Sequence, residues 1–383
     1  EAPDYGHETT SEAMSYIVWA ASMHDVLVKK GKITDSNDLK KAWNTLEAII
    51  PGWSKASGLP EKYEFETIWT QPRLKADAAN EEDLPSSYPA KQVTGAGAEA
   101  INPLYEQFKT AYSGDKGYYL MHWLADVDDW YGFGGGNGKF TFINTFQRGE
   151  QESCFETVPH PCIEELKYGN EQTGIKGIFN GSNVPEQYAF TNAPDAEDRA
   201  IQAVYFADRY LVDTTGVADL AGKMGDQCRN DMFDKYYKKI GCQDIHTESS
   251  GLESQHYLMG WYTSWGGALD TNYGGHYDWA WQIGCSHSHQ FYQNPLAAYG
   301  LLYDSKMSGS LTSGGKEDYE KSLQRQIEMY QWLQSVDGPF AGGCTNSYRG
   351  RYEKYPSGYP TFYDMVYVPH PVYADPGSNH WIG

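Results

Sequence analysis

The chain has 383 residues, which is enough for one large domain or two ordinary ones. Its 51 acidic residues outnumber its 30 basic residues, and the formal net charge of −21 disfavours binding to nucleic acid or to an anionic membrane. No apolar run in the sequence approaches the length that spans a bilayer. Aromatic residues make up 15% of the chain, and such side chains either stack on flat ligands such as sugar rings or fill a core.

Helical periodicity recurs along the chain. Apolar residues at helical spacing predict helices over 11–30, 36–50, 101–131, 195–213, 217–240, 252–265, 294–304 and 317–335. Strands are expected only near 140–146 and 361–368. The remaining long segments, 52–100, 266–293 and 338–383, are expected to be loops. Helices in series, joined by long aromatic loops, predict an all-α toroid with its site on the loops.

The first twelve residues combine four carboxylates, a histidine and a tyrosine directly before the first predicted helix. This density of titratable groups indicates acid–base chemistry. A structural alternative is a capping box, because Thr9 and Glu12 have the Thr-x-x-Glu spacing in which the glutamate reaches back to a free backbone amide.

The cysteines do not indicate a metal or redox motif. The six of them, Cys154, Cys162, Cys228, Cys242, Cys285 and Cys344, have no Cys-x-x-Cys spacing. They permit disulfides if the protein is secreted, but the sequence determines no pairing.

Eight blocks in chain order carry a family resemblance. They are Glu1–Met14, Thr145–Glu152, Thr191–Asp195, Lys235–Gly241, Ser286–Pro295, Tyr330–Ser335, Thr345–Pro356 and Pro371–Trp381. Together they resemble glycoside hydrolase family 48, which contains inverting, processive, chain-end-acting cellulases and chitin-active relatives in some insects. The resemblance implies an (α/α)6 barrel with a tunnel leading into an open cleft. Family catalytic domains are longer, so residues 1–383 are expected to form part of a single catalytic domain, an incomplete barrel without its N- and C-terminal portions.

The resemblance also implies catalytic roles. Glu12, in Thr-Thr-Ser-Glu, matches the family's proton donor, whereas Asp195 and Glu1 match two carboxylates proposed as the general base. Asp195 follows Pro194 at an expected helix start, where the helix dipole should lower the pKa of a carboxylate. A lowered pKa suits a base, and it equally suits a purely structural aspartate.

Further residues match the family's binding positions. Those similar to tunnel-lining or site-lining aromatics are Trp279, Trp281, Tyr292, Trp381, Phe146 and Tyr262. Those similar to a structural calcium site are Gln151, Glu156 and Asp375. Oxygen donors suit calcium, and the alternative is exposed carboxylates paired with Lys or Arg. No cofactor is expected for catalysis.

The function expected from the resemblance is hydrolysis of β-1,4-glycosidic bonds in cellulose with inversion, from chain ends, releasing mainly cellobiose. A secreted protein acting on cellulose or a related β-1,4-linked polysaccharide is expected, with a cellulosome or binding module as a partner outside this stretch. Two alternatives stay open. One is a chitinase on the same scaffold, because residues 52–100 depart from the bacterial pattern, and the other is a non-catalytic carbohydrate-binding protein.

Overall fold

The computed structural model describes residues 8–35, 37–50, 91–93, 99–112, 119–128, 141–142, 145–147, 155–157, 190–234, 236–244, 247, 249–265, 282–284, 287–289, 293–336, 341–348 and 352–369. Over these segments, none of the helices combines the length and the apolar character needed to cross a bilayer.

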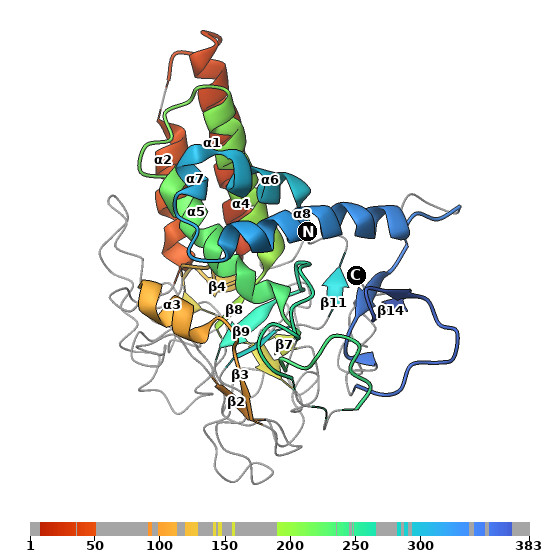
Figure 1. Ribbon diagram of the computed structural model, residues 1–383. Helices are drawn as coiled ribbons and strands as arrows, with labels where there is room; N and C mark the ends of the chain where they lie inside the picture. The colour runs from red at the N-terminus through yellow and green to blue at the C-terminus, as the bar shows by residue number, and fades with distance from the viewer. Residues whose placement is uncertain are drawn as a thin grey trace, which may run out of the picture.

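Helices dominate the described part. They are α1 (Ser11–Lys29), α2 (Asp38–Leu46), α3 (Tyr105–Tyr112), α4 (Pro194–Arg209), α5 (Ala218–Gln227), α6 (Pro295–Tyr303), α7 (Ser305–Ser308) and α8 (Gly315–Trp332), with 3-10 helices η1 (Glu47–Ile49) and η4 (Cys228–Met232). Helix α4 is central, because it packs against α1, α5 and α6, and α6 in turn packs against α8. Figure 1 shows these helices gathered at one end of the molecule, with α3 and most of the small sheets at the other.

Local sequence signals explain where several helices begin. Helix α4 has Pro194 in its first turn, where the missing amide hydrogen has no helical partner to lose. Helix α6 likewise starts with Pro295, and the Asn294 side chain caps it by accepting a hydrogen bond from the Ala297 amide at 3.1 Å. Asp304 caps the short α7 that follows directly.

The strands are short and form small antiparallel sheets. They are β1 (Glu8–Thr10), β2 (Lys91–Val93), β3 (Glu99–Ile101), β4 (Leu124–Asp126), β5 (Thr141–Phe142), β6 (Thr145–Gln147), β7 (Phe155–Thr157), β8 (Phe190–Asn192), β9 (Thr263–Trp265), β10 (Gln282–Gly284), β11 (His287–His289), β12 (Gly343–Thr345), β13 (Thr361–Phe362) and β14 (Met365–Val368). The sheets have the orders β1-β4-β5, β10-β9-β8, β11-β12-β14-β13, β2-β3 and β6-β7. Two of the sheets connect directly to helices, because β1 leads into α1 and β8 leads into α4.

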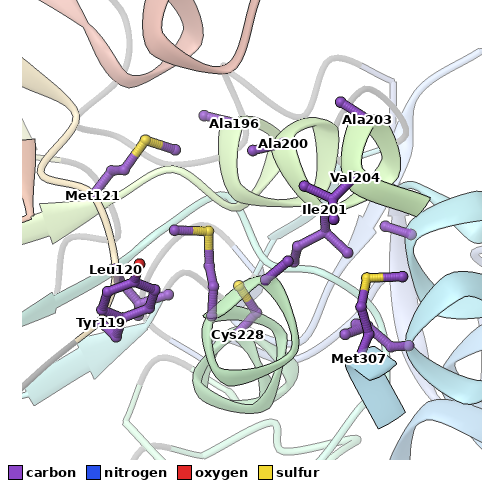
Figure 2. Packing of buried hydrophobic residues seen from close by; sticks show 14 of the residues in the cluster. Tyr119, Leu120, Met121, Ala196, Ala200, Ile201, Ala203, Val204, Cys228 and Met307 are labelled. Carbon is purple, nitrogen blue, oxygen red and sulfur yellow. The ribbon is translucent and has the colours of Figure 1, made fainter. Parts of the chain in front are cut away.

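The main core lies between α4 and its neighbours. Figure 2 shows the buried face of α4, with Ile201 directed toward Cys228 and Ala196 on the side of Met121. The small alanine side chains on this face allow the packed helices to approach closely. Because the interior is densely packed, even a change of one methyl group in this contact should alter the stability of the fold. A second cluster joins the end of α8 to the sheet that contains β14.

A helix-rich fold with few strands is confirmed, and the helices expected over 11–30, 195–213, 294–304 and 317–335 correspond to α1, α4, α6 and α8. The helix expected over 36–50 appears as α2 followed by η1, and that over 217–240 is shorter, ending in α5 and η4. The expected strand regions contain β5, β6, β13 and β14. The expectation of strands only in those regions is wrong, because β2, β10, β11 and β12 lie in segments expected to be loops. Each of these strands has only three residues, too few for an alternating pattern to show in the sequence.

Two helix predictions are wrong. The segment 252–265 consists of turns and ends in β9, whose residues pair with β8 and β10 rather than with their own chain neighbours. In the described part of 101–131, the one helix is the short α3, flanked by β3 and β4. In 252–265 the apolar spacing reflects burial of residues such as Leu258 and Met259 and the pairing of β9 with distant strands, which periodicity cannot distinguish from a helix over so few residues.

Cysteines in the described part carry free thiols. Cys228, Cys242 and Cys344 are buried and unpaired with one another. Cys154, Cys162 and Cys285 lie outside the described residues.

Candidate active site

The entrance of α1 fixes the candidate acid, Glu12. Strand β1 pairs with β4 and runs directly into α1, and the Ser11 amide donates to the Trp123 carbonyl at 3.0 Å. The helix is capped by Thr10, whose Oγ1 accepts from the Ala13 amide at 3.2 Å. The predicted cap at Thr9 is therefore wrong by one residue, because Thr9 continues the strand. The half-buried Glu12 side chain accepts a long 3.4 Å hydrogen bond from the Ser11 hydroxyl.

The start of α4 fixes the candidate base, Asp195. Its Oδ2 accepts a hydrogen bond from Arg199 at 3.0 Å, one turn along the same helix. Its Oδ1 is buried and has no hydrogen-bond partner among the described residues. A carboxylate held by one oxygen, with the other unused, can accept a hydrogen bond from a water molecule.

The electrostatic setting of Asp195 differs from the prediction. Burial, followed by the negative charge of Glu12, raises the pKa of Asp195 to about 7, whereas Arg199 opposes this rise. The predicted lowering by the helix start is wrong, because desolvation outweighs the helix dipole. The effect of Glu12 also shows that the two carboxyl groups lie within electrostatic reach of one another.

A hydrogen-bonded chain links α4 back to α1. Arg199 donates to the Ser15 hydroxyl at 2.9 Å, and Ser15 donates to the Glu12 backbone carbonyl at 2.7 Å. The Arg199 guanidinium also lies over the Tyr16 ring, 4.6 Å from its centroid. The candidate acid and the candidate base are therefore joined through one arginine and one serine.

Behind Asp195 lies a group of fully buried carboxyls that sequence reasoning missed. Asn192 donates to Asp231 at 3.1 Å and, weakly, to Glu197 at 3.4 Å, while Thr263 donates to Asp231 at 2.7 Å. Burial raises the pKa of Asp231 to about 7 and, with the charge of Asp231, raises the pKa of Glu197 well above its usual range. Both oxygens of Asp198 are buried without a hydrogen-bond partner in the described part.

These interior carboxyls favour the protonated, neutral form. Burial, with the charges of Asp231 and Asp195, raises the pKa of Asp198 well above its usual value, so the neutral form is favoured. The run Asp195-Ala196-Glu197-Asp198 was the available sequence signal, because acids at positions i, i+2 and i+3 point to different sides of a helix and do not share one solvated face. The partner Asp231 lies in η4 and could not be connected to them from the sequence.

The whole chain matches a known protein family. The sequence model described as "Glycosyl hydrolase family 48" matches residues 1–383. The chain belongs to this family.

Several family 48 relatives share this stretch of sequence. "Cellulose 1,4-beta-cellobiosidase (reducing end) CelS" of Acetivibrio thermocellus is 48% identical over 391 residues, covering 100% of this chain and 49% of the relative. "Exoglucanase-2" of Thermoclostridium stercorarium is 44% identical, covering 100% of this chain and 40% of the relative. "Endoglucanase F" of Ruminiclostridium cellulolyticum is 44% identical, with 100% and 51% coverage. The chain thus spans about half the length of the curated relatives it matches.

The structure brings Glu12 and Asp195 together, but it does not reach every residue that family 48 resemblance implies. Tyr262 is buried, with its ring 6.1 Å from that of Trp261. Phe146 lies in β6 opposite Glu156 in β7, and the side chains of both fall outside the description. The other predicted site residues lie outside the described residues, and they are Glu1, Gln151, Trp279, Trp281, Tyr292, Asp375 and Trp381.

Among the described residues, one other group has metal-binding side chains close together: His24, Asp35 and Asp38, near the start of α2. Ion pairs account for its contacts. His24 Nδ1 lies 3.1 Å from Asp38, and Lys41 bonds to the same carboxylate at 2.9 Å. It is separate in sequence from the predicted calcium ligands.

Proposed function

We propose that the protein hydrolyses β-1,4-glycosidic bonds of cellulose with inversion, acting processively from chain ends and releasing mainly cellobiose. Glu12 is the general acid and Asp195 is the general base. The observation that carries the proposal is the approach of these two carboxyls across the α1–α4 contact, close enough for the charge of Glu12 to raise the pKa of Asp195, while Oδ1 of Asp195 has no hydrogen-bond partner among the described residues. Names of the family 48 relatives, a cellobiosidase and an exoglucanase, support cellulose as the substrate.

The chemistry requires a protonated acid and an ionised base on opposite sides of the scissile bond, separated by roughly 6.5–9.5 Å so that a water fits between the base and the sugar. Glu12 donates its proton to the leaving glycosidic oxygen. Asp195 accepts a proton from the attacking water through Oδ1, while Arg199 holds Oδ2. A base with a pKa of about 7 is a strong proton acceptor once ionised, which favours this step near neutral pH.

The remaining parts of the proposal follow the family. We take residues 1–383 as part of one catalytic domain built on an (α/α)6 barrel, in which α1, α4 and α6 form adjoining helices of the barrel. The aromatic residues Trp279, Trp281, Tyr292 and Trp381 stack on glucose units. The enzyme is secreted, and any cellulosome or cellulose-binding module attaches outside this stretch.

A structural calcium ion held by Gln151, Glu156 and Asp375 is also part of the proposal, because all three offer oxygen donors. A chelator should lower the melting temperature of the wild type, and added calcium should restore it. The variant Asp375→Ala should melt at the lower temperature with or without chelator. Equal melting of the wild type with and without chelator would remove the site from the proposal.

The decisive experiment measures soluble products released by the full-length protein from amorphous cellulose and from colloidal chitin. Wild type is compared with Glu12→Gln and Asp195→Asn, and proton NMR of the first products reports the anomeric configuration. The matched controls are Glu106→Gln, an exposed glutamate on α3, and Asp219→Asn, which occupies the same second position in α5 as Asp195 in α4 but is exposed.

Cellobiose of inverted configuration, lost in both site variants and kept in both controls, is the expected result. Chito-oligomers would move the substrate to chitin with the same residues. Binding without product on either polymer would refute hydrolysis and favour a binding protein. Loss of activity in Glu1→Gln but not in Asp195→Asn would transfer the base role to Glu1.

A further inference from the structure

Arg199 occupies the junction between the two candidate catalytic carboxyls. It lies on α4 four residues after Asp195, so its side chain and that of Asp195 share one face of the helix. Its two terminal nitrogens are used in different directions. One donates to Asp195 Oδ2 at 3.0 Å, and the other donates to the Ser15 hydroxyl on α1 at 2.9 Å.

The guanidinium is held in place by more than these two bonds. Its carbon atom lies 4.6 Å from the centroid of the Tyr16 ring, a cation–π distance. Because the guanidinium is planar, fixing both nitrogens and stacking the plane on a ring leaves it little rotational freedom. The Ser15 hydroxyl is itself fixed by donating to the Glu12 carbonyl at 2.7 Å. The Asp195 carboxylate is therefore tied to the backbone of the turn that carries Glu12.

We propose that Arg199 is a positioning residue of the hydrolytic site, which fixes the Asp195 carboxylate relative to Glu12, leaves Oδ1 for the water, and keeps this carboxylate ionised next to the acid. This inference rests on the proposed function and deepens it. Nothing in the family resemblance assigned a role to Arg199. Its contacts to both α1 and Asp195 distinguish it from a surface arginine.

The charge role follows from the groups that surround Asp195. They are Glu12 on α1, Glu197, Asp198 and Arg199 on α4, and Asp231 in η4 behind them. The four carboxyls carry negative charge when ionised, and burial also disfavours the ionised form of Asp195. The positive charge of Arg199 works against both, so its removal would raise the pKa of Asp195 above about 7.

The positioning role has a different signature. A base must hold its water within a few tenths of an ångström of the productive geometry, and looser placement lowers the rate at every pH. Ser15 contributes only to placement, because its hydroxyl is neutral. Substitution of Ser15 therefore separates placement from charge.

The test uses the full-length protein and β-cellobiosyl fluoride, a substrate whose fluoride leaving group needs little protonation, so that kcat/KM against pH reports the base. The variants are Arg199→Met, Arg199→Lys and Ser15→Ala. The matched control is Arg325→Met, because Arg325 on α8 is also partly buried and stacked on an aromatic ring, that of Tyr363 at 3.6 Å, yet it bonds to the His256 carbonyl.

We expect a rising curve with a midpoint near pH 7 in the wild type. Arg199→Met should move the midpoint upward by about one pH unit or more, so that the loss at pH 6 exceeds the loss at pH 9 by roughly ten-fold. Arg199→Lys should keep the midpoint within about half a unit and lower the plateau, since a lysine keeps the charge but not the two-directional contact. Ser15→Ala should lower the plateau alone, and Arg325→Met should change neither.

An active Arg199→Met with an unmoved midpoint and a uniformly lower plateau would overturn the charge role and leave Arg199 as a packing residue. A Ser15→Ala plateau equal to the wild type would overturn the positioning role. If Arg199→Met does not fold, as judged by its melting curve, a midpoint in Arg199→Lys shifted as far as one unit would also overturn the inference. Wild type without any hydrolysis would instead refute the proposed function, and the inference with it.

Discussion

Arg229 offers the sharpest test of how the interior is held together. Its side chain is 1% exposed and bonds to Asp226 at 3.0 Å and to Asp318 at 2.7 Å. It also donates to Thr312 Oγ1 at 3.1 Å. This guanidinium is the centre of a buried ion-pair group that joins η4, α5 and α8. Arg229→Met keeps most of the volume and removes all of these bonds.

The expected cost follows from what is left behind. Asp226 is fully buried and Asp318 is 8% exposed, so both carboxylates lose their charged partner without gaining water. Breaking a buried pair by removing one partner costs about 3–5 kcal/mol. Asp226 keeps one hydrogen bond from the Thr312 amide at 3.0 Å, which favours the lower half of that range. We expect a loss of about 3–4 kcal/mol in the free energy of unfolding.

Urea unfolding followed by tryptophan fluorescence measures this loss in the full-length protein. The triple variant Arg229→Met/Asp226→Asn/Asp318→Asn is the rescue control, because neutral amides need no charged partner, and it should recover at least half of the lost stability. A loss below about 1 kcal/mol in Arg229→Met would refute the reasoning, since it would mean that water reaches these carboxylates.

Three further outcomes are expected. Thr10→Ala should lower the free energy of unfolding by about 1 kcal/mol through loss of the α1 cap, and Thr9→Ala should cost clearly less; the reverse order in urea melts would contradict the capping assignment. Gly222→Ala should destabilise the fold by about 1–3 kcal/mol or more, because the added methyl group would overlap a backbone carbonyl of α7. In the control Gly309→Ala the added methyl group meets only ordinary contacts, so this variant should be neutral or slightly stabilising. Equal melting of the two variants would contradict this packing. The pKa of Asp231 is raised to about 7, so its neutral form stabilises the fold fully below about pH 4, and that stability is lost as the pH rises to 7. Asp231→Asn should therefore flatten the slope of unfolding free energy against pH by up to about 1.4 kcal/mol per pH unit. An unchanged slope would contradict a buried, protonated Asp231.

The helices that sequence reasoning predicted well carry their own boundary signals. Pro194 and Pro295 mark the starts of α4 and α6, and the apolar periodicity of 317–335 is long enough to identify α8. The strands could not be predicted in the same way, since each has only two to four residues and several, such as β1, β8 and β11, pair with strands far along the chain. Thr263, for example, pairs with Asn192 and contributes a hydroxyl to the buried Asp231, a relation that no local pattern contains.

Of the candidate site, Glu12 and Asp195 were identified through family resemblance, and their proximity depended on the packing of α1 against α4. The arginine between them carried no sequence signal that separates it from the chain's other basic residues. Its i, i+4 spacing from Asp195 is common on solvated helices, where such a pair contributes only a few tenths of a kcal/mol. What gives Arg199 its importance is Ser15, which lies 184 residues earlier in the chain.

The pKa of Asp195 illustrates why a correct position led to a wrong electrostatic prediction. A carboxylate in the first turn of a helix gains about 0.3–1 kcal/mol from the dipole, which corresponds to well under one pKa unit. Burial of a carboxyl can raise its pKa by several units, and the neighbouring Glu12 adds to the rise. Burial and Glu12 together outweigh the helix dipole, and Arg199 lowers the pKa of Asp195 by only part of that rise. The pKa of a base at this position is therefore determined by the packing of two helices and by one cation. A change in any of these contacts should shift the pH range in which the base is ionised.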